Sequence, residues 1–131
     1  RSLTGCGSAL RDVLTIECDR VRKITWVFHS QGEAEYPTEG APSTLPEDFD
    51  GAEYLTKVRE HPIESFCPRF TLLDGNRLTL TFDDETLRHA RVQTMRSPDN
   101  PADRLRHTLM LTAFGPCATF GVRYEMEAPN R

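Results

Sequence analysis

The chain has 131 residues, the length of a single domain, and its 37% of hydrophobic residues predicts a thin core. Its net charge of −4 argues against a nucleic-acid binder, which would carry a surplus of Lys and Arg. No apolar run approaches the ~18–20 residues of a membrane helix, so we expect membrane contact only through an anchor or lipid outside this sequence. We therefore treat residues 1–131 as one domain.

The first predicted elements are two strands, residues 12–18 and 22–30. Residues 12–18 are rich in β-branched side chains, and apolar residues alternate with polar ones along residues 22–30. The segment between them is short enough for a tight turn. The two strands are therefore predicted to pair as an antiparallel hairpin.

Residues 31–52 are predicted to form a long acidic loop. They contain three glycines and three prolines, which interrupt any regular element. Loops of this length inside small domains are usually functional or mobile. Residues 52–61 follow as one or two helical turns or an irregular strand, which ends before Pro62.

The strongest hairpin signal is the segment Asp74-Gly75-Asn76. It separates two alternating apolar runs, residues 69–73 and 77–82. Asp-Gly is a preferred sequence of tight hairpin turns. A hairpin is therefore predicted here from local sequence alone.

Three further strands are predicted after a polar turn at residues 83–85. Residues 87–95, 105–114 and 118–126 each alternate between apolar and polar side chains. The last two are joined by Gly115-Pro116-Cys117, which is predicted to be a turn. We therefore predict an all-β fold, an antiparallel β-sandwich of about seven or eight strands with no long helix.

Four cysteines stand singly along the chain, at Cys6, Cys18, Cys67 and Cys117. An even number of separated cysteines is typical of disulfide-braced domains in oxidising compartments, whereas structural zinc usually draws its ligands in close pairs. Free thiols are the other alternative. The preferred pairing is Cys6–Cys18 with Cys67–Cys117, and Cys18–Cys117 with Cys6–Cys67 remains open. We expect an extracellular or cell-surface location.

The segment Leu3-Thr4-Gly5-Cys6 resembles the lipobox of bacterial lipoproteins, in which the cysteine becomes the lipidated N-terminus. This resemblance implies an alternative function, a bacterial envelope lipoprotein or periplasmic inhibitor domain anchored through Cys6. Its location would then be the periplasm or the outer membrane. Lipidation would leave three cysteines, an odd number, for disulfide pairing.

Charge is unevenly distributed between two stretches of the chain. Residues 31–54 contain seven acidic residues and no Lys or Arg, whereas residues 86–107 are rich in Arg and His. The two stretches are either ordinary solvated loops or a bipolar surface that steers a charged partner. For a binding surface, the candidate residues are Arg88, Arg91, Arg104 and Arg106.

Residues 67–75 and 109–124 resemble segments of CUB domains, which are extracellular β-sandwiches of about this length. The early cysteines lie closer together here than in that family, and its tyrosine-proline segment is missing. The resemblance implies loops organised by calcium, for which Asp48, Asp50 and Glu53 are the candidate carboxylate ligands. A solvated acidic turn is the alternative, and we expect no bound metal or cofactor.

These patterns predict a non-enzymatic extracellular recognition module that binds another protein. It would be an ectodomain or one domain of a larger cell-surface or secreted protein. A hydrolase whose site assembles across space is a further alternative. No catalytic motif supports an enzyme, because the four histidines stand singly at His29, His61, His89 and His107.

Overall fold

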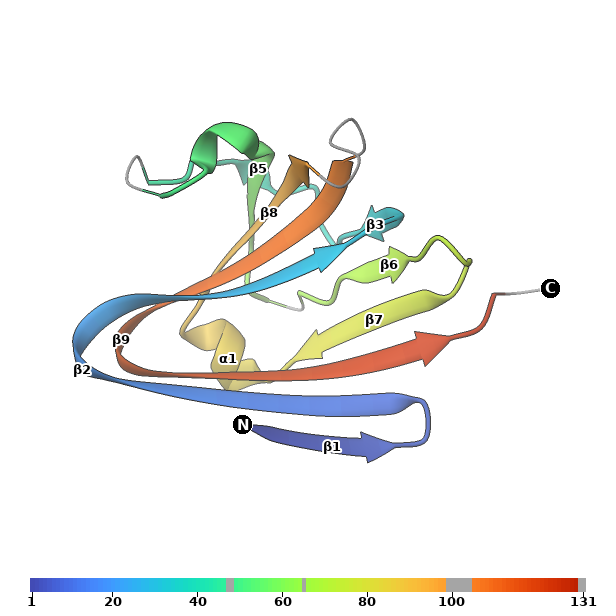
Figure 1. Cartoon of the computed structure of the whole chain (residues 1–131), viewed down its shortest axis with the longest axis horizontal. Helices are drawn as coiled ribbons and strands as arrows, with labels where there is room; N and C mark the ends of the chain where they lie inside the picture. Colours follow the sequence, from blue (N-terminus) through green and yellow to red (C-terminus); the bar gives the residue numbers. More distant parts are fainter. Residues whose placement is uncertain (47–48, 65, 99–104, 130–131) are drawn as a thin grey trace.

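A computed structural model describes residues 1–46, 49–64, 66–98 and 105–129 of the chain. The described residues form one antiparallel sheet with two short helices. The strands are β1 (Ser2–Cys6), β2 (Ala9–Ser30), β3 (Glu33–Glu35), β4 (Ala41–Pro42), β5 (Thr56–His61), β6 (Arg69–Thr71), β7 (Arg77–Phe82), β8 (Arg91–Pro98) and β9 (Leu105–Glu127). The helices are the 3₁₀ helix η1 (Ala52–Tyr54) and α1 (Asp84–Arg88). Figure 1 shows their arrangement.

Two long bent strands, β2 and β9, organise the sheet. They pair with each other from Ala9 opposite Glu125 to Ser30 opposite His107, and the register shifts between Glu17 and Arg22. Both strands bend at this corner (Figure 1). The two predicted hairpins, 12–18 with 22–30 and 105–114 with 118–126, are therefore wrong.

The two segments predicted to be turns, residues 19–22 and 115–117, lie opposite each other at one corner of the sheet. Arg22 is the partner of Gly115, whose φ of 157° is disfavoured for other residues. Between the pairs Glu17–Cys117 and Arg22–Gly115, β2 contains more residues than β9. Such an irregularity in the pairing bends both strands. Because the two turn-like segments lie opposite each other, both strands change direction together and neither one folds back on itself.

The bend places the two halves of β9 in different parts of the sheet. Its first half pairs with β8 and its second half with β7, and the sheet order is β3-β6-β7-β9-β8-β5-β4, with β2 and then β1 beside β9. The prediction of an antiparallel all-β fold is confirmed. In the described part of the chain the strands form one continuous curled sheet.

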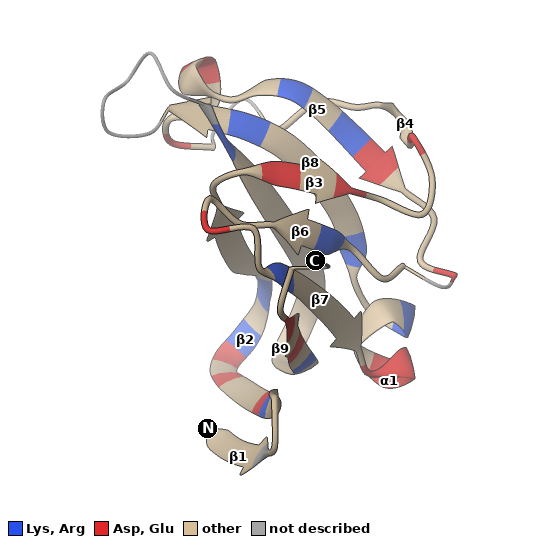
Figure 2. Cartoon of the chain, turned by 90° about the vertical axis from the view of Figure 1, so that its right-hand side faces the viewer, with Lys and Arg blue, Asp and Glu red and all other residues tan. Residues whose placement is uncertain are grey.

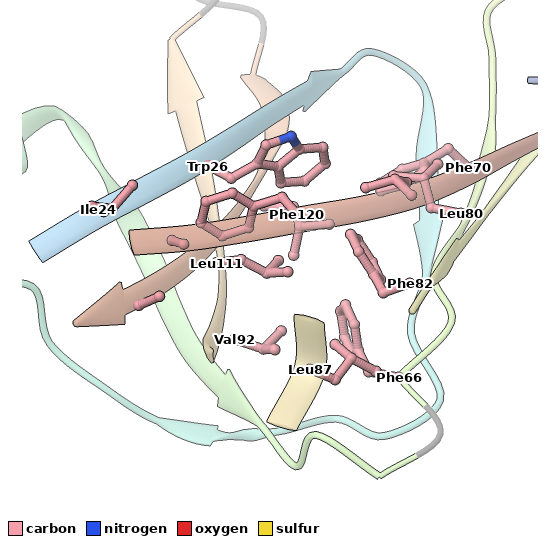
Figure 3. Close-up of a cluster of buried hydrophobic side chains, with 14 residues drawn as sticks. Ile24, Trp26, Phe66, Phe70, Leu80, Phe82, Leu87, Val92, Leu111 and Phe120 are labelled. Atoms are coloured by element: carbon pink, nitrogen blue, oxygen red, sulfur yellow. The ribbon is translucent and has the colours of Figure 1, made fainter. Parts of the chain in front are cut away.

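The hydrophobic core lies between the two halves of this curled sheet (Figure 3). Trp26 of β2 meets Phe82 of β7 edge to face, with ring centroids 5.6 Å apart. The buried cluster consists of Ile24, Trp26, Phe66, Phe70, Leu80, Phe82, Leu87, Val92, Leu109, Leu111, Ala113, Ala118, Phe120 and Val122. Its members come from β2, β6, β7, β8, β9 and α1 and from the segment before β6, so the core depends on long-range packing.

The shorter elements agree with the sequence in part. The hairpin around Asp74-Gly75-Asn76 is confirmed, because β6 pairs with β7. Residues 52–61 contain both a helical turn and a strand, and the predicted loop 31–52 contains β3 and β4. The strand predicted at 87–95 begins only at Arg91, because α1 occupies Asp84–Arg88. The acidic first turn and basic last turn of α1 are helix signals that the alternation obscured.

Candidate functional site

The predicted disulfide bonds are absent from the described part of the structure. Cys18, Cys67 and Cys117 are free thiols, and the side chain of Cys6 lies outside the described residues. Cys18 packs against the core, whereas Cys67 and Cys117 are exposed. The disulfide pattern predicted from the cysteine spacing is therefore corrected.

Strand geometry keeps these thiols apart. Cys117 pairs with Glu17, so Cys18, the next residue along, presents its side chain to the opposite face. The Sγ of Cys67 lies 3.7 Å from the Oγ1 of Thr81, whose partner on β9 is Arg123. Arg123 lies six residues beyond Cys117, about 20 Å along the strand, while bridged Cα atoms lie within about 7 Å.

Thiol labelling of the native protein, without a reductant, tests this correction. We expect Cys67 and Cys117 to react quickly with a maleimide and Cys18 to react slowly, because its sulfur packs against the core. Mass spectrometry of proteolytic fragments measures each modification. Unlabelled Cys67 and Cys117 that become reactive only after reduction would restore the disulfide prediction.

The candidate arginines do not converge on one surface. Arg88 ends α1, while Arg91 opens β8 and forms an ion pair with a glutamate of β5. Arg106 on β9 donates from Nε to the Oγ of Ser97 at 3.1 Å, and Ser97 lies six residues from Arg91, about 20 Å along β8. Arg104 lies outside the described residues.

The candidate calcium ligands do not form a described site. Asp50 and Glu53 are exposed near and within η1, and Asp48 lies outside the described residues. Within the described part of the chain, no group of three or more His, Cys, Asp or Glu side chains could hold a metal ion.

His61 is the most buried histidine among the described residues. Its Nε2 lies 2.7 Å from the Oγ1 of Thr94, and its Nδ1 lies 3.4 Å from the Oγ1 of Thr38. The ring packs between Tyr36 and Phe66. Burial lowers the pKa of His61 below its usual 6.5, so the ring is neutral at pH 7. Both ring nitrogens of His61 are hydrogen-bonded to threonine hydroxyl groups, so we interpret His61 as a buried structural residue.

A hollow of about 430 Å³ lies between β3, β5 and β8, next to His61, and we call it the β3–β8 pocket. Figure 2 shows basic segments on β5 and β8 and acidic ones on β3. The pocket is lined by Ala34, Glu35, Tyr36, Thr38, Glu39, Lys57, Arg59, Thr94, Met95, Arg96 and His107.

Burial and the charge of Arg96 shift the pKa values of two side chains that line the β3–β8 pocket. Burial raises the pKa of Tyr36 to about 12, and the nearby Arg96 charge opposes this rise, so the hydroxyl keeps its proton at pH 7. The pKa of His107 is lowered by burial and by Arg96, and its Nε2 donates to the carbonyl oxygen of Gly32 at 3.1 Å. His107 is therefore neutral and adds no charge to the pocket. Sequence reasoning missed this group, because its members come from four separate segments.

The sheet also has free edges, which differ in how well they are protected. Within the described residues, β3 and β4 pair on one side only, but β3 is short and acidic and β4 has two residues, one of them a proline. β2 pairs with β1 only as far as Val13, so residues 14–30 have β9 as their only described partner. Residues 24–30 are uncharged and rich in β-branched and aromatic residues, and lack the devices that protect natural edges.

Apolar side chains, with the Arg1–Asp12 ion pair among them, line the core-facing surface of β1 and of the first half of β2. Leu3 and Leu10 are 60% and 40% exposed, and Leu14 and Ile16 are only partly covered by the core. Leu10, Asp12, Leu14 and Ile16 lie two positions apart along β2 and therefore share a face. Leu3 lies on the same face because it pairs with Asp12. We call the free edge 24–30 of β2 together with Leu3, Leu10, Leu14 and Ile16 the open side of the sheet.

Comparisons with known proteins find no relative for this arrangement. No protein-family model, no curated protein and no solved structure matches the chain. The CUB and lipobox resemblances therefore gain no support from these comparisons. Among the helices of the described residues, none has the length and apolar character needed to span a membrane.

Proposed function

We propose that this protein is a non-enzymatic recognition module that binds another protein by accepting an extended segment along the open side of its sheet. The single observation that carries the proposal is the edge of β2 at residues 24–30, which has no partner strand other than β9 among the described residues. An unpaired strand edge offers a row of backbone N–H and C=O groups to an incoming strand. The curled halves of the sheet face each other as sandwich layers do, and a strand added to β2 extends one of these layers.

The residues of the open side indicate which kind of partner segment it accepts. Main-chain hydrogen bonds to residues 24–30 supply affinity, and every second side chain of the added strand faces the core side of the sheet. There it covers Leu10 and Leu14, which are only partly buried in this chain. We therefore expect an extended partner segment with apolar residues at alternate positions and no charge on that face.

The lipoprotein alternative is less compatible with the fold. Cys6 ends β1, and a tight turn at Gly7 and Ser8 connects it to β2. Cleavage before a lipidated cysteine would remove Ser2 to Gly5, which pair with β2. The hairpin at the start of the chain thus supports the recognition module.

The extracellular location, as an ectodomain or as part of a larger surface or secreted protein, remains a proposal from the cysteine pattern. The free thiols of Cys18, Cys67 and Cys117 weaken its basis, because disulfides are the usual mark of an oxidising compartment. The thiol-labelling experiment described above distinguishes the two cases.

Substitution of Val27 tests binding at the open side. Val27 lies within the free edge and is 43% exposed, and Val21 in the bend of the same strand is 70% exposed. A photo-reactive residue at Leu10 captures the partner from native extract, with Leu73 as the control position. The purified partner is expected to bind Val27→Lys at least about tenfold more weakly, because a charged edge disfavours strand addition.

The matched variant Val21→Lys is expected to keep the affinity within about twofold of the unmodified chain. The proposal is wrong if both variants bind equally well, or if Leu73 captures the same partner as efficiently as Leu10. Capture of only a second copy of this chain would also contradict it. Circular dichroism melting of both variants shows that a difference in affinity is not a difference in folding.

A further inference from the structure

Two of the residues that line the β3–β8 pocket each carry a buried donor without an acceptor. Within the described part of the chain, the hydroxyl of Tyr36 and the Nε of Arg96 are enclosed by protein atoms and have no hydrogen-bond partner. Buried polar groups in folded proteins are nearly always paired, because leaving one unpaired is costly. An arginine Nε–H can only donate, so what is missing here is an acceptor.

Two more cations line the same pocket without a described counter-ion. Lys57 and Arg59 of β5 belong to none of the ion pairs found among the described residues, and neither does Arg96. Glu35 and Glu39 also line the pocket, yet they form no ion pair with these cations in that part of the chain. The lining therefore has three positive and two negative side chains, a surplus of one positive charge.

The backbone of β5 is distorted where it presents Lys57. Lys57 has a φ of 54°, the single positive value among the described residues other than glycine. The register of β5 against β8 shifts between Thr56 and Arg59, so this residue sits in a bulge. Bulges re-aim side chains, and strained residues of this kind concentrate at ligand sites.

We propose that the β3–β8 pocket is a carboxylate-binding site, in which Tyr36 and Arg96 donate hydrogen bonds to the carboxylate and Lys57 and Arg59 provide positive charge near it. Carboxylate oxygens accept several hydrogen bonds and match the arginine side chain. One negative charge balances the surplus of the lining. The doubly charged form of phosphate exceeds this surplus.

The volume of the pocket points to a carboxylate attached to a larger group. About 430 Å³ is within the usual range of small-molecule sites and exceeds what a bare carboxylate fills. The carboxylate belongs either to a small organic acid or to the C-terminus of a peptide. The pocket is distinct from the open side of the sheet, so this proposal and the proposed function can fail independently.

Nuclear magnetic resonance of the full chain tests the site directly, because the Nε–Hε signal of Arg96 reports its own hydrogen bond. The probes are acetate, the peptides acetyl-Gly-Gly and acetyl-Gly-Gly-amide, and inorganic phosphate. We expect saturable shifts of this signal with acetate and acetyl-Gly-Gly and no saturable shift with the neutral amide. A peptide at least about tenfold tighter than acetate identifies a C-terminal carboxylate, and similar affinities identify small organic acids.

Tyr36→Phe removes the hydroxyl and keeps the ring that packs against His61, Phe66 and Phe70. Carboxylate affinity is expected to fall at least about fivefold in this variant. The control is Tyr54→Phe, which removes the same atom from a side chain that is 64% exposed and should leave the affinity unchanged.

Three results would overturn the carboxylate site. The first is the absence of a saturable shift at Arg96 with either carboxylate probe up to about 100 mM, the range of the weakest specific ligands. The second is tighter binding of phosphate than of both carboxylates. The third is equal affinity of the Tyr36→Phe variant and the unmodified chain. Amide spectra show that the Tyr36→Phe and Tyr54→Phe variants are both folded.

Discussion

Replacing Phe120 by alanine is expected to lower the free energy of unfolding by about 3–5 kcal/mol. Phe120 is 2% exposed on β9 and lies in the centre of the core (Figure 3). Removing its ring leaves a cavity that the rigid β2–β9 ribbon cannot close, and that loss is a large share of the stability of a small domain. Urea unfolding followed by tryptophan fluorescence measures the change, since Trp26 belongs to the same cluster.

The same substitution at Phe114 is the matched control on the same strand. Phe114 is 71% exposed, so Phe114→Ala should change the free energy of unfolding by about 0.5 kcal/mol or less. Equal losses at the two positions would mean that the curled sheet does not enclose its core between the halves of β9.

Gly32→Ala is expected to destabilise the fold by about 3–5 kcal/mol. Gly32 has a φ of 87°, and a Cβ there would clash with the carbonyl oxygen of Thr71. That oxygen belongs to the backbone of β6 and cannot rotate away, so β3 would have to separate from β6. The carbonyl of Gly32 also accepts the hydrogen bond of His107. Urea unfolding measures the loss.

Gly7→Ala separates the steric clash from the backbone conformation. Gly7 has a φ of 60° in the turn between β1 and β2, and an added Cβ meets no atom within 4 Å. The expected loss is about 1–2 kcal/mol, the cost of a left-handed conformation alone. If Gly32→Ala is no worse than Gly7→Ala, an added Cβ at Gly32 does not clash with Thr71 and the prediction is wrong.

Elements whose signals are local could be predicted well. The hairpin of β6 and β7 was predicted because Asp74-Gly75-Asn76 contains its own turn chemistry, and Asp74 accepts a hydrogen bond from the backbone of Asn76. The alternation that predicted strands at 22–30 and 118–126 also appears as buried and exposed faces in β2 and β9.

The corner of the long ribbon could not be predicted in the same way. A tight turn and a bend of a continuous strand share the same residues, glycine, proline and charged side chains. Which one forms depends on whether the flanking strands pair with each other or with a third strand. Residues 12–18 and 22–30 both lie on β2 beside β9, whose paired residues are at least 77 positions away in the sequence, and this partner is not encoded locally.

The candidate sites show the same contrast between local sequence signals and long-range structure. Sequence alone indicated cysteines and arginines as residue types, but Arg91 and Arg106 lie far apart on β8 and β9, and the described thiols lie on different faces or strands. Tyr36 and Arg96 had no sequence signal, because a tyrosine and an arginine 60 positions apart match no motif. Their missing acceptor became visible only with side-chain burial.

The sequence by itself determined that this protein is built from antiparallel strands, because alternation and turn chemistry act over a few residues. The tertiary structure decided the rest: which strand each strand pairs with, where β2 and β9 bend, and which cations share a pocket. It also left residues 24–30 of β2 with β9 as their only partner strand in the described part of the chain. The physical reason is that strand pairing and side-chain burial are long-range interactions, which depend on the whole chain.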